Sequence, residues 1–336
     1  MHPKIKINRG WRPLIVGAVA IAAVVTMAGC SAAGPTAASS SGSSPQKQRT
    51  IAYVGALTPN VYYDAAECGF KTEAKAKGVD VILNTPSTFS ANAQESVLQA
   101  VLTRQPDGIA LGPAVDTATA ATIATAAAQN IPTAIIANPP FASKAITYIN
   151  ADVDAATALN VDALAKLLPS GADVAIIALQ PNSGIDALRV NGYKKALKKH
   201  PDLNLVETEY SGVNTADASR LVSSITEAHP NVKGLLVTSG TPTVGAATQV
   251  AALGQTGKIK VMGYDASPTA VQAVRAGTVQ GLVSQYPQEA GKLALDSILN
   301  NLDGTKVPKV QNFAPFLITP KNVDTAAGKK AAYSSC

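Results

Sequence analysis

A single carboxylate at the end of an apolar strand is the clearest candidate for chemistry in this sequence. Residues 258–264 are rich in apolar and β-branched side chains, typical of a strand buried in a parallel sheet, and Asp265 follows them directly. Ser267 and Pro268 supply an N-cap and a first helical residue, so the next helix has its cap without Asp265. Ligands of open α/β sheets bind beyond the carboxyl ends of the strands. We therefore predict that Asp265 binds a ligand; the alternative is an acid that only helps to cap a helix.

The side chains on which most enzymes depend are scarce or unsuitably placed. The chain has three histidines: His2 lies in the leading segment, and His200 and His229 each precede a proline. The sequence has no cluster of His, Cys and acidic residues with metal-ligand spacing. It also has no glycine-rich phosphate loop and no Gly-x-Ser-x-Gly elbow. These features predict a protein that is not an enzyme and that uses no metal or cofactor.

Composition indicates a globular chain with little electrostatic bias. Of the 336 residues 46% are hydrophobic and 15% are charged, which is enough for a sizeable core and, at this length, for two domains. The formal net charge of +6 includes Lys4, Lys6, Arg9 and Arg12, and without these four it falls to +2. Because the remainder has no basic run, a nucleic-acid partner is not expected.

The start of the chain has the pattern of an export signal followed by a linker. Residues 1–12 carry only positive charge, and residues 14–29 are an apolar run too short to span a bilayer comfortably. The run ends in Met-Ala-Gly before Cys30, which resembles a bacterial lipobox. We expect residues 1–29 to be a lipoprotein signal peptide and residues 30–49 a flexible tether rich in Ser, Ala and Gly. Lipidation of Cys30 would anchor the protein to the outer face of the bacterial cell membrane; an ordinary secreted protein and an uncleaved anchor are the alternatives.

Two further cysteines, Cys68 and Cys336, remain once Cys30 is assigned to the lipid. Outside the cytoplasm such a pair is commonly oxidised. A bond between them would tie the C-terminal tail to the first helix of the folded body. The sequence leaves both states open, because the distance between the two Cα atoms cannot be derived from it.

From residue 50 onward, strand-like and helix-like segments alternate about every 25–30 residues, as a series of βαβ units requires. The pattern predicts an α/β protein with two doubly wound parallel-sheet lobes joined by hinge strands. The chain is expected to cross between lobes near Ala151, near Gln285 and before Thr319, and residues 310–319 are expected to form one last strand region. Each lobe then contains two segments: 50–151 with 286–313 in lobe 1, and 152–285 with 314–336 in lobe 2, which includes the tail.

Several short patterns between residues 50 and 320 are specific when taken together. They are Asn60-Val61-Tyr62-Tyr63 ahead of a helix ending in Lys77-Gly78-Val79, Gln105-Pro106-Asp107-Gly108-Ile109, Asn130-Ile131-Pro132, Ala228-His229-Pro230-Asn231-Val232-Lys233-Gly234, Val261-Met262-Gly263-Tyr264-Asp265 and Gln285-Tyr286-Pro287-Gln288. With them the chain resembles the type I periplasmic solute-binding proteins of ABC importers, in particular the ribose- and galactose-type sugar-binding branch.

In that family a sugar lies between two lobes that close over it, with aromatic rings on its apolar faces and polar side chains on its hydroxyls. The resemblance implies that Tyr62 and Tyr63 are the stacking aromatics, and that Asp265 and Gln285 are the hydroxyl-binding acid and amide. Adjacent residues point about 100° apart on a helix, so only one of the two tyrosines is expected to face the cleft squarely.

Other positions of the resemblance carry alternatives. Arg189 lies near the family's ligand-binding arginine, but a surface salt bridge to Asp186 on the same helix face is an equal alternative. Asn138 and Ser239 occupy stretches where ribose-type members have an Asp-Arg pair and an Asn, and Asn138 also fits a turn ahead of two prolines. The predicted ligand-binding set is Asn60, Tyr62, Tyr63, Asn138, Arg189, Ser239, Asp265 and Gln285.

The function implied by the resemblance is that of a monomeric, extracytoplasmic, lipid-anchored protein that captures a sugar or polyol and delivers it to an ABC permease. A sensing subunit for a chemoreceptor or receptor kinase, and the binding of another small polar molecule, stay open. A repressor with the same two-lobe fold is excluded, because the signal peptide lies where its DNA-binding module would be. Replacing Asp265 with Ala is expected to leave folding largely intact and to remove stabilisation by ligand.

Overall fold

The computed structural model describes residues 48–181, 184–334 and 336. The predicted signal peptide, Cys30 and nearly all of the predicted tether lie outside these residues. Where the chain is described, strands and helices alternate as predicted, and they form two sheets that we call sheet A and sheet B.

Sheet A is entirely parallel. Its order is β11-β5-β4-β3-β1-β2. The strands are β1 (Thr50–Val54), β2 (Asp80–Leu83), β3 (Gly108–Leu111), β4 (Thr133–Ile136), β5 (Thr147–Ala151) and β11 (Val310–Phe313). The inner strands β3, β4 and β5 are buried along their whole length, which explains their continuous apolar runs.

Sheet B has the order β12-β10-β9-β8-β6-β7, and only its edge strand β12 is antiparallel. The strands are β6 (Ala172–Ala178), β7 (Leu203–Tyr210), β8 (Val232–Val237), β9 (Lys260–Tyr264), β10 (Gly281–Ser284) and β12 (Phe316–Ile318). The prediction of two parallel-sheet α/β lobes is therefore confirmed.

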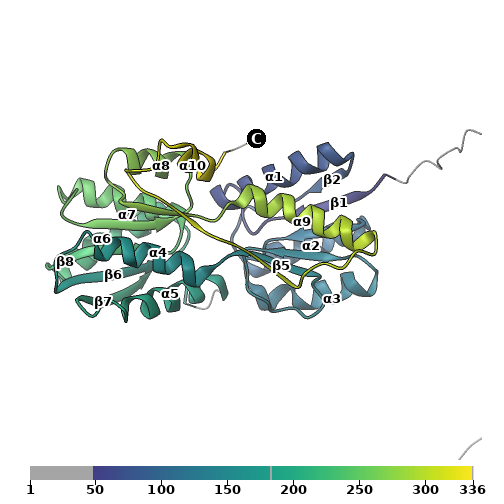
Figure 1. Ribbon diagram of the computed structural model, residues 1–336. Helices are drawn as coiled ribbons and strands as arrows, with labels where there is room; N and C mark the ends of the chain where they lie inside the picture. The colour runs from purple at the N-terminus through teal and green to yellow at the C-terminus, as the bar shows by residue number, and fades with distance from the viewer. Residues whose placement is uncertain (1–47, 182–183, 335) are drawn as a thin grey trace, which may run out of the picture. The chain divides into compact units, whose positions relative to one another are not determined.

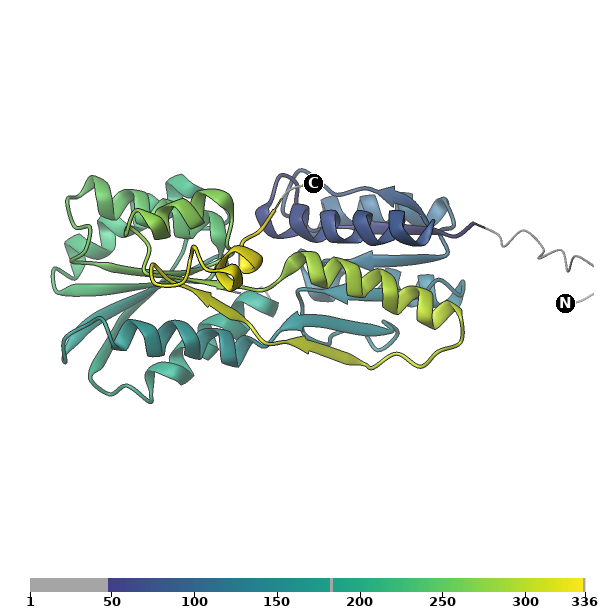
Figure 2. The same ribbon diagram turned by 45° about the horizontal axis from the view of Figure 1, so that its top comes forward.

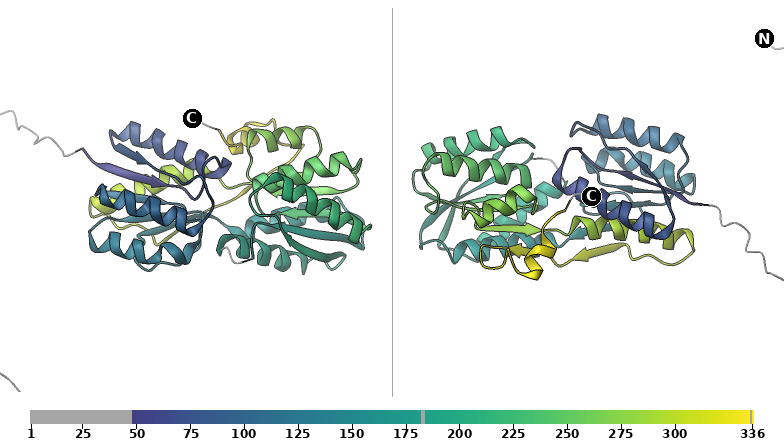
Figure 3. Two further views of the ribbon diagram at one scale, coloured as in Figure 1. Left: turned by 180° about the vertical axis from the view of Figure 1, so that it is seen from behind. Right: turned by 90° about the horizontal axis from the view of Figure 1, so that it is seen from above.

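Helices cover both faces of each sheet (Figures 1 and 3). On sheet A, α1 (Val61–Lys77) and α9 (Pro287–Leu302) cover one face, and α2 (Ala91–Thr103), the 3-10 turn Asp116–Thr119 and α3 (Ala120–Ala128) cover the other. On sheet B, α4 (Val153–Ala165) and α5 (Gly184–Leu197) lie on one face, and α6 (Thr215–Ala228), α7 (Gly240–Ala252) and α8 (Pro268–Arg275) on the other, with the short α10 (Ala326–Ala331) in the tail.

The predicted last strand region, residues 310–319, contains two strands. The structure divides it into β11, which joins sheet A, and β12, which joins sheet B. Pro315 lies between them and has no backbone N–H to donate to a ladder, so the strand ends there and the chain passes from one sheet to the other. We propose from this sheet membership that the lobes have the boundaries expected from the sequence.

Helices α1 and α9 come from distant parts of the sequence and lie side by side on sheet A (Figure 1). Two glycines allow their backbones to meet. A Cβ atom added to Gly69 would lie 1.9 Å from the carbonyl oxygen of Gln288, and one added to Gly291 would lie 1.9 Å from the carbonyl oxygen of Ala66. The segment that follows lobe 2 is thus packed rigidly against the first helix of lobe 1.

We expect Gly291→Ala to destabilise the protein by about 1–3 kcal/mol, because a backbone carbonyl cannot yield to the added methyl group without separating the two helices. The cost should exceed the roughly 0.5–1 kcal/mol that alanine gains over glycine in a helix. Urea unfolding measures the difference. Asn300→Ala, at an exposed position of the same helix, is the matched control, and a Gly291→Ala protein as stable as that control would contradict the packing.

The C-terminal tail returns to lobe 1. Cys336 forms a disulfide with Cys68 of α1 across a sequence separation of 268 residues, with the two Cα atoms 5.3 Å apart. Within the described parts of the chain, no helix has the length and apolar character that crossing a membrane requires.

Candidate functional site

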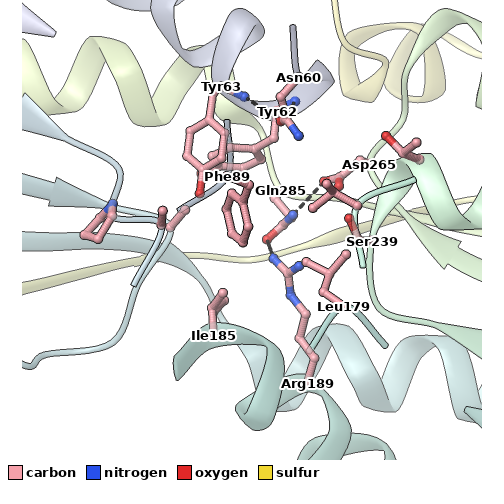
Figure 4. Close-up of a pocket in the computed structure, with 15 residues that line it drawn as sticks. Asn60, Tyr62, Tyr63, Phe89, Leu179, Ile185, Arg189, Ser239, Asp265 and Gln285 are labelled. Atoms are coloured by element: carbon pink, nitrogen blue, oxygen red, sulfur yellow. Dashed lines mark hydrogen bonds between the residues drawn. The ribbon is translucent and has the colours of Figure 1, made fainter. Parts of the chain in front are cut away.

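One pocket is built from the loops that follow the carboxyl ends of the strands and from the N-terminal turns of the helices that come after those loops. Loops after β1, β2, β3 and β4 contribute from lobe 1, and loops after β6, β7, β8 and β9 from lobe 2, as the general rule for open α/β sheets requires. Figure 4 shows the side chains converging. The lining residues are Asn60, Tyr62, Tyr63, Phe89, Pro113, Ala114, Ala137, Leu179, Ile185, Arg189, Val213, Ser239, Thr241, Asp265 and Gln285.

Asp265 lies at the centre of the hydrogen bonding in this pocket. Its side chain is buried, and its backbone is left-handed, with φ of 63°. Oδ2 accepts a hydrogen bond of 3.0 Å from the backbone N–H of Gly240. Oδ1 accepts one of 2.8 Å from Nε2 of Gln285 and one of 3.1 Å from the hydroxyl of Tyr333. The carboxylate is therefore held by three donors.

Both sequence interpretations of Asp265 contain part of the answer. Ser267 caps α8 as predicted, accepting a hydrogen bond from the N–H of Ala270, so Asp265 is not needed there. The carboxylate instead accepts from Gly240, the first residue of α7, and so it caps a different helix while it lines the pocket. A carboxylate at a helix N-terminus interacts favourably with the helix dipole, so this contact also stabilises the start of α7.

Arg189 is buried and faces the pocket. One terminal nitrogen donates to the carbonyl oxygen of Thr238 at 2.8 Å, and the other donates to Oε1 of Gln285 at 2.7 Å. The guanidinium also lies 4.6 Å from the ring centre of Tyr264, a cation–π contact. Burial lowers the pKa of Arg189, but nearby groups including Asp265 outweigh it and the net shift is upward, so the side chain is charged.

The alternative of a surface salt bridge between Asp186 and Arg189 is wrong. Both side chains are buried, and Asp186 accepts hydrogen bonds from the backbone N–H groups of Leu179 and Gln180 and from the hydroxyl of Thr238. Among the described residues, Nε of Arg189 has no hydrogen-bond partner. A buried donor of this kind costs free energy unless something pairs with it.

Gln285 joins the two charges. Its Oε1 accepts from Arg189 and its Nε2 donates to Asp265, so the cation and the anion are linked through one neutral amide (Figure 4). Gln285 lies directly after β10, at the point where the chain crosses from sheet B to α9 of lobe 1. The network therefore connects the pocket-facing side of lobe 2 to a crossing segment.

Three aromatic rings line the lobe 1 side of the pocket. Tyr62 and Tyr63 contact each other edge to face with ring centres 5.4 Å apart. Both line the pocket, because they occupy the first turn of α1, whose N-terminal end meets the pocket. Burial raises the pKa of both hydroxyls well above the ordinary value, so both remain protonated. Phe89 is the third ring.

The remaining predicted residues divide into two groups. Asn60 and Ser239 line the pocket from the N-cap positions of α1 and α7; Oδ1 of Asn60 accepts from the N–H groups of Tyr62 and Tyr63, whereas the Ser239 hydroxyl makes no capping bond. Asn138 is not among the lining residues. It is buried, and its amide donates to the carbonyl oxygen of Pro113, so it supports the neighbouring loop instead.

Sequence reasoning missed Phe89 and an apolar part of the pocket formed by Ala114, Leu179, Ile185 and Val213. One signal was available for Phe89. It is the only large apolar residue in the polar stretch 84–90, which ends at Ser90, the N-cap of α2. The small aliphatic residues have no such signal, because isolated Ala, Leu and Val side chains are common in any loop.

The free space among the lining side chains is about 50 Å³. Pockets that enclose a small molecule usually measure about 300–1,000 Å³. A molecule as large as a sugar therefore enters this site only when lining groups of the two lobes move apart. In the described residues, no group of three or more His, Cys, Asp or Glu side chains is placed to hold a metal ion.

Comparison with known proteins agrees with this architecture. Residues 51–306 match the family model described as a periplasmic binding protein domain. The chain is 30% identical over 142 residues to the D-allose-binding periplasmic protein of Escherichia coli K12, covering 42% of this chain and only 46% of that relative. It is 22% identical over 285 residues to the ribose import binding protein RbsB of Bacillus subtilis 168, covering 83% of this chain and 90% of that protein.

Two solved structures are similar throughout their length. An ABC transporter solute-binding protein from Agrobacterium vitis, bound with α-D-tagatopyranose, has a TM-score of 0.82 and 23% identity and covers 85% of this chain and 100% of its own. GanP, a glucose-galactose binding protein from Geobacillus stearothermophilus, has a TM-score of 0.78 and 25% identity. The match covers 83% of this chain and 100% of GanP. All four proteins are described as binding proteins, in agreement with the prediction that this chain is not an enzyme.

Proposed function

We propose a function for this chain from its membership of the periplasmic binding protein domain family, to which it belongs. It captures a neutral sugar or polyol between its two lobes and delivers it to an ABC permease. Its fold is that of ABC transporter solute-binding proteins. The observation that carries the ligand class is the buried Arg189–Gln285–Asp265 network facing three aromatic rings.

A sugar presents two kinds of surface, and the pocket has a partner for each. Its C–H faces pack against aromatic rings, here Tyr62, Tyr63 and Phe89. Its hydroxyls both donate and accept, and the site offers the spare donors of Arg189 and the remaining acceptor capacity of Asp265. Charged partners make hydrogen bonds worth about 1.5–3 kcal/mol each, which compensates for the loss of water from the ligand.

The charges of the pocket favour an uncharged ligand. Arg189 and Asp265 are connected through Gln285, so neither needs a charged ligand to balance it. A carboxylate or phosphate would compete with Asp265 for the guanidinium, and an ammonium group would compete with Arg189 for the carboxylate. Burying an additional unpaired charge is costly, whereas a polyhydroxyl compound adds none.

Cellular placement follows from the N-terminal pattern and the cysteines. We propose that Cys30 is lipidated and that residues up to 49 tether the folded body to the outer face of the membrane. The disulfide between Cys68 and Cys336 supports an oxidising compartment, because such bonds are rare where thiols are kept reduced. The protein is proposed to act as a monomer, with a separate ATPase providing the energy of transport.

Ligand capture is proposed to work through hinge bending. Three segments cross between the sheets: β5 to α4, β10 to α9, and β11 to β12. Because the pocket has lining residues in both lobes, a ligand that contacts both favours the closed arrangement over the open one. The closed form is the one expected to be presented to the permease.

A thermal-shift screen of residues 50–336 tests the ligand class. We expect ribose, allose, arabinose, tagatose, glucose, galactose or a related polyol to raise Tm, since a ligand at 100 times its Kd adds about 2.7 kcal/mol of stability. Nucleosides and amino acids are the comparison classes. A shift confined to amino acids, or no shift in any class, would contradict a sugar site. Loss of cellular uptake of the stabilising sugar on deletion of this protein would then support transport over sensing.

A further inference from the structure

The C-terminal tail makes a connection between the lobes in addition to the three crossing segments. After β12 it forms α10 on lobe 2 and then runs toward α1 of lobe 1 (Figure 2). The hydroxyl of Ser284 donates to the carbonyl oxygen of Ala331 at 2.6 Å, and the N–H of Tyr333 donates to the carbonyl oxygen of Ala266 at 2.8 Å. The tail is thus attached to lobe 2 beside the strand ends that carry Asp265 and Gln285.

Tyr333 contacts the binding network directly. Its hydroxyl donates to Oδ1 of Asp265 at 3.1 Å and accepts from the backbone N–H of Gln285 at 3.2 Å. The side chain is only 5% exposed, and burial raises the pKa of the hydroxyl well above its ordinary value, so it remains a donor. Tyr333 does not line the pocket, and any effect on a ligand must pass through Asp265.

The orientation of the Asp265 carboxylate depends on these contacts. Tyr333 and Gln285 both donate to Oδ1, while Gly240 alone donates to Oδ2. Two donors on one oxygen and a backbone donor on the other restrict rotation of the carboxylate. Removal of the tyrosine hydroxyl removes one of the three hydrogen bonds that restrain the carboxylate.

A covalent anchor lies three residues after Tyr333. Cys336 is bonded to Cys68 of α1, the helix whose first turn carries Tyr62 and Tyr63. Nε2 of Gln288, in the first turn of α9, also donates to the carbonyl oxygen and the hydroxyl of Ser334. Because α1 and α9 meet through glycines, this attachment point on lobe 1 is rigid.

We propose that Tyr333 is a positioning residue for the ligand-binding carboxylate of Asp265, and that the Cys68–Cys336 disulfide keeps it in place by fastening the tail to lobe 1. This inference rests on the function proposed above. Three residues of extended chain reach about 10 Å, so wide separation of the lobes pulls on Tyr333 and closure returns it to the carboxylate. Opening of the lobes and disorder of the carboxylate are thereby coupled.

The first test is Tyr333→Phe, which removes the hydroxyl and keeps the ring. Titration calorimetry with D-ribose, D-allose and D-tagatose should show about tenfold weaker binding than the parent protein, equivalent to about 1.4 kcal/mol. Tyr210→Phe, at an exposed edge of lobe 2, is the matched control and should bind normally. Equal affinity in Tyr333→Phe and the control would overturn the proposal.

A readout without ligand separates this inference from the proposed function. Hydrogen exchange by mass spectrometry should show faster exchange of peptides that contain the Gly240 and Gln285 amides in Tyr333→Phe, because each N–H donates within the network that the hydroxyl restrains. If no sugar binds, the proposed function fails and this measurement still decides the role of Tyr333. Unchanged exchange of both peptides would reject that role.

The disulfide is tested by combination. Cys68→Ser with Cys336→Ser should weaken sugar binding by the same factor as Tyr333→Phe, and the triple variant should be no weaker than Tyr333→Phe alone. Additive losses would mean that the disulfide acts independently of Tyr333 and would reject the link. If the serine variant does not fold, reduction of the folded protein followed by capping of both thiols with iodoacetamide gives the same comparison.

Discussion

Asp265→Asn is expected to weaken sugar binding at least about 100-fold, because the substitution replaces a charged acceptor at the centre of the pocket by a neutral amide. Asparagine keeps one oxygen, but its NH₂ group must face one of the present donors: the N–H of Gly240, the amide of Gln285 or the hydroxyl of Tyr333. Affinity falls through lost charge and through displacement of Gln285 from Arg189. Titration calorimetry with the sugar found in the thermal screen measures the change.

The structure also revises the expected effect on folding. From the sequence, Asp265→Ala should leave folding largely intact. In the structure alanine would leave three buried donors without an acceptor, each at a cost of about 1–3 kcal/mol, so the alanine protein should be markedly less stable. Asp202→Asn, an exposed position of lobe 2 with the same change of charge, is the control. Normal sugar affinity in Asp265→Asn would remove Asp265 from the site.

Loss of the disulfide is expected to give a large change in stability. The bond closes a loop of 268 residues, nearly the whole described body, and a loop of that length stabilises by about 5–6 kcal/mol in the chain-entropy description. The Cys68→Ser, Cys336→Ser protein should therefore unfold at a lower urea concentration than the oxidised parent. The reduced parent protein is the natural comparison, since it has the same side chains without the bond.

The midpoint and the slope of the transition carry different information. A lower midpoint reports lost stability, and a changed slope reports a change in the compactness of the unfolded chain, which the bond also restricts. Equal midpoints for the oxidised parent, the reduced parent and the serine variant would contradict a stabilising disulfide. A separate low-urea step in the serine variant would place the loss in the tail alone.

Much of the fold follows from local pattern. Helix α6 (Thr215–Ala228) is a clear example. For α6 the reason is visible: Asn214 caps its start by accepting from the N–H of Asp217, and one face carries the buried Ala218, Val222 and Ile225. Where helix propensity, the capping residue and the spacing of the buried side chains agree, the sequence alone is sufficient to predict the helix.

What failed depends on contacts between distant residues. The pairing of β11 with β5 and of β12 with β10 is set by the sheet edge that each strand meets, and no local pattern encodes it. The same holds for the site. The strand-end rule pointed to Asp265 and the family resemblance to Gln285. The burial of Arg189 over Tyr264 and the approach of Tyr333 from the tail exist only in the folded chain. Asn138 has a suitable side chain at a strand end, yet its amide is used by Pro113.

The order of segments along the chain also determines when sheet A can be completed during synthesis. Sheet A takes its edge strand β11 from residues 310–313 and one of its covering helices, α9, from residues 287–302, although its other strands end at residue 151. During synthesis one apolar face of sheet A, which α1 covers only in part, therefore stays incompletely covered until the whole second lobe has been made. A chain whose segments come in this order stays incompletely folded while it is being synthesised. An incompletely folded chain is the form in which a secreted protein can be translocated across a membrane. Fragments that end before residue 287 are expected to be insoluble on the same grounds.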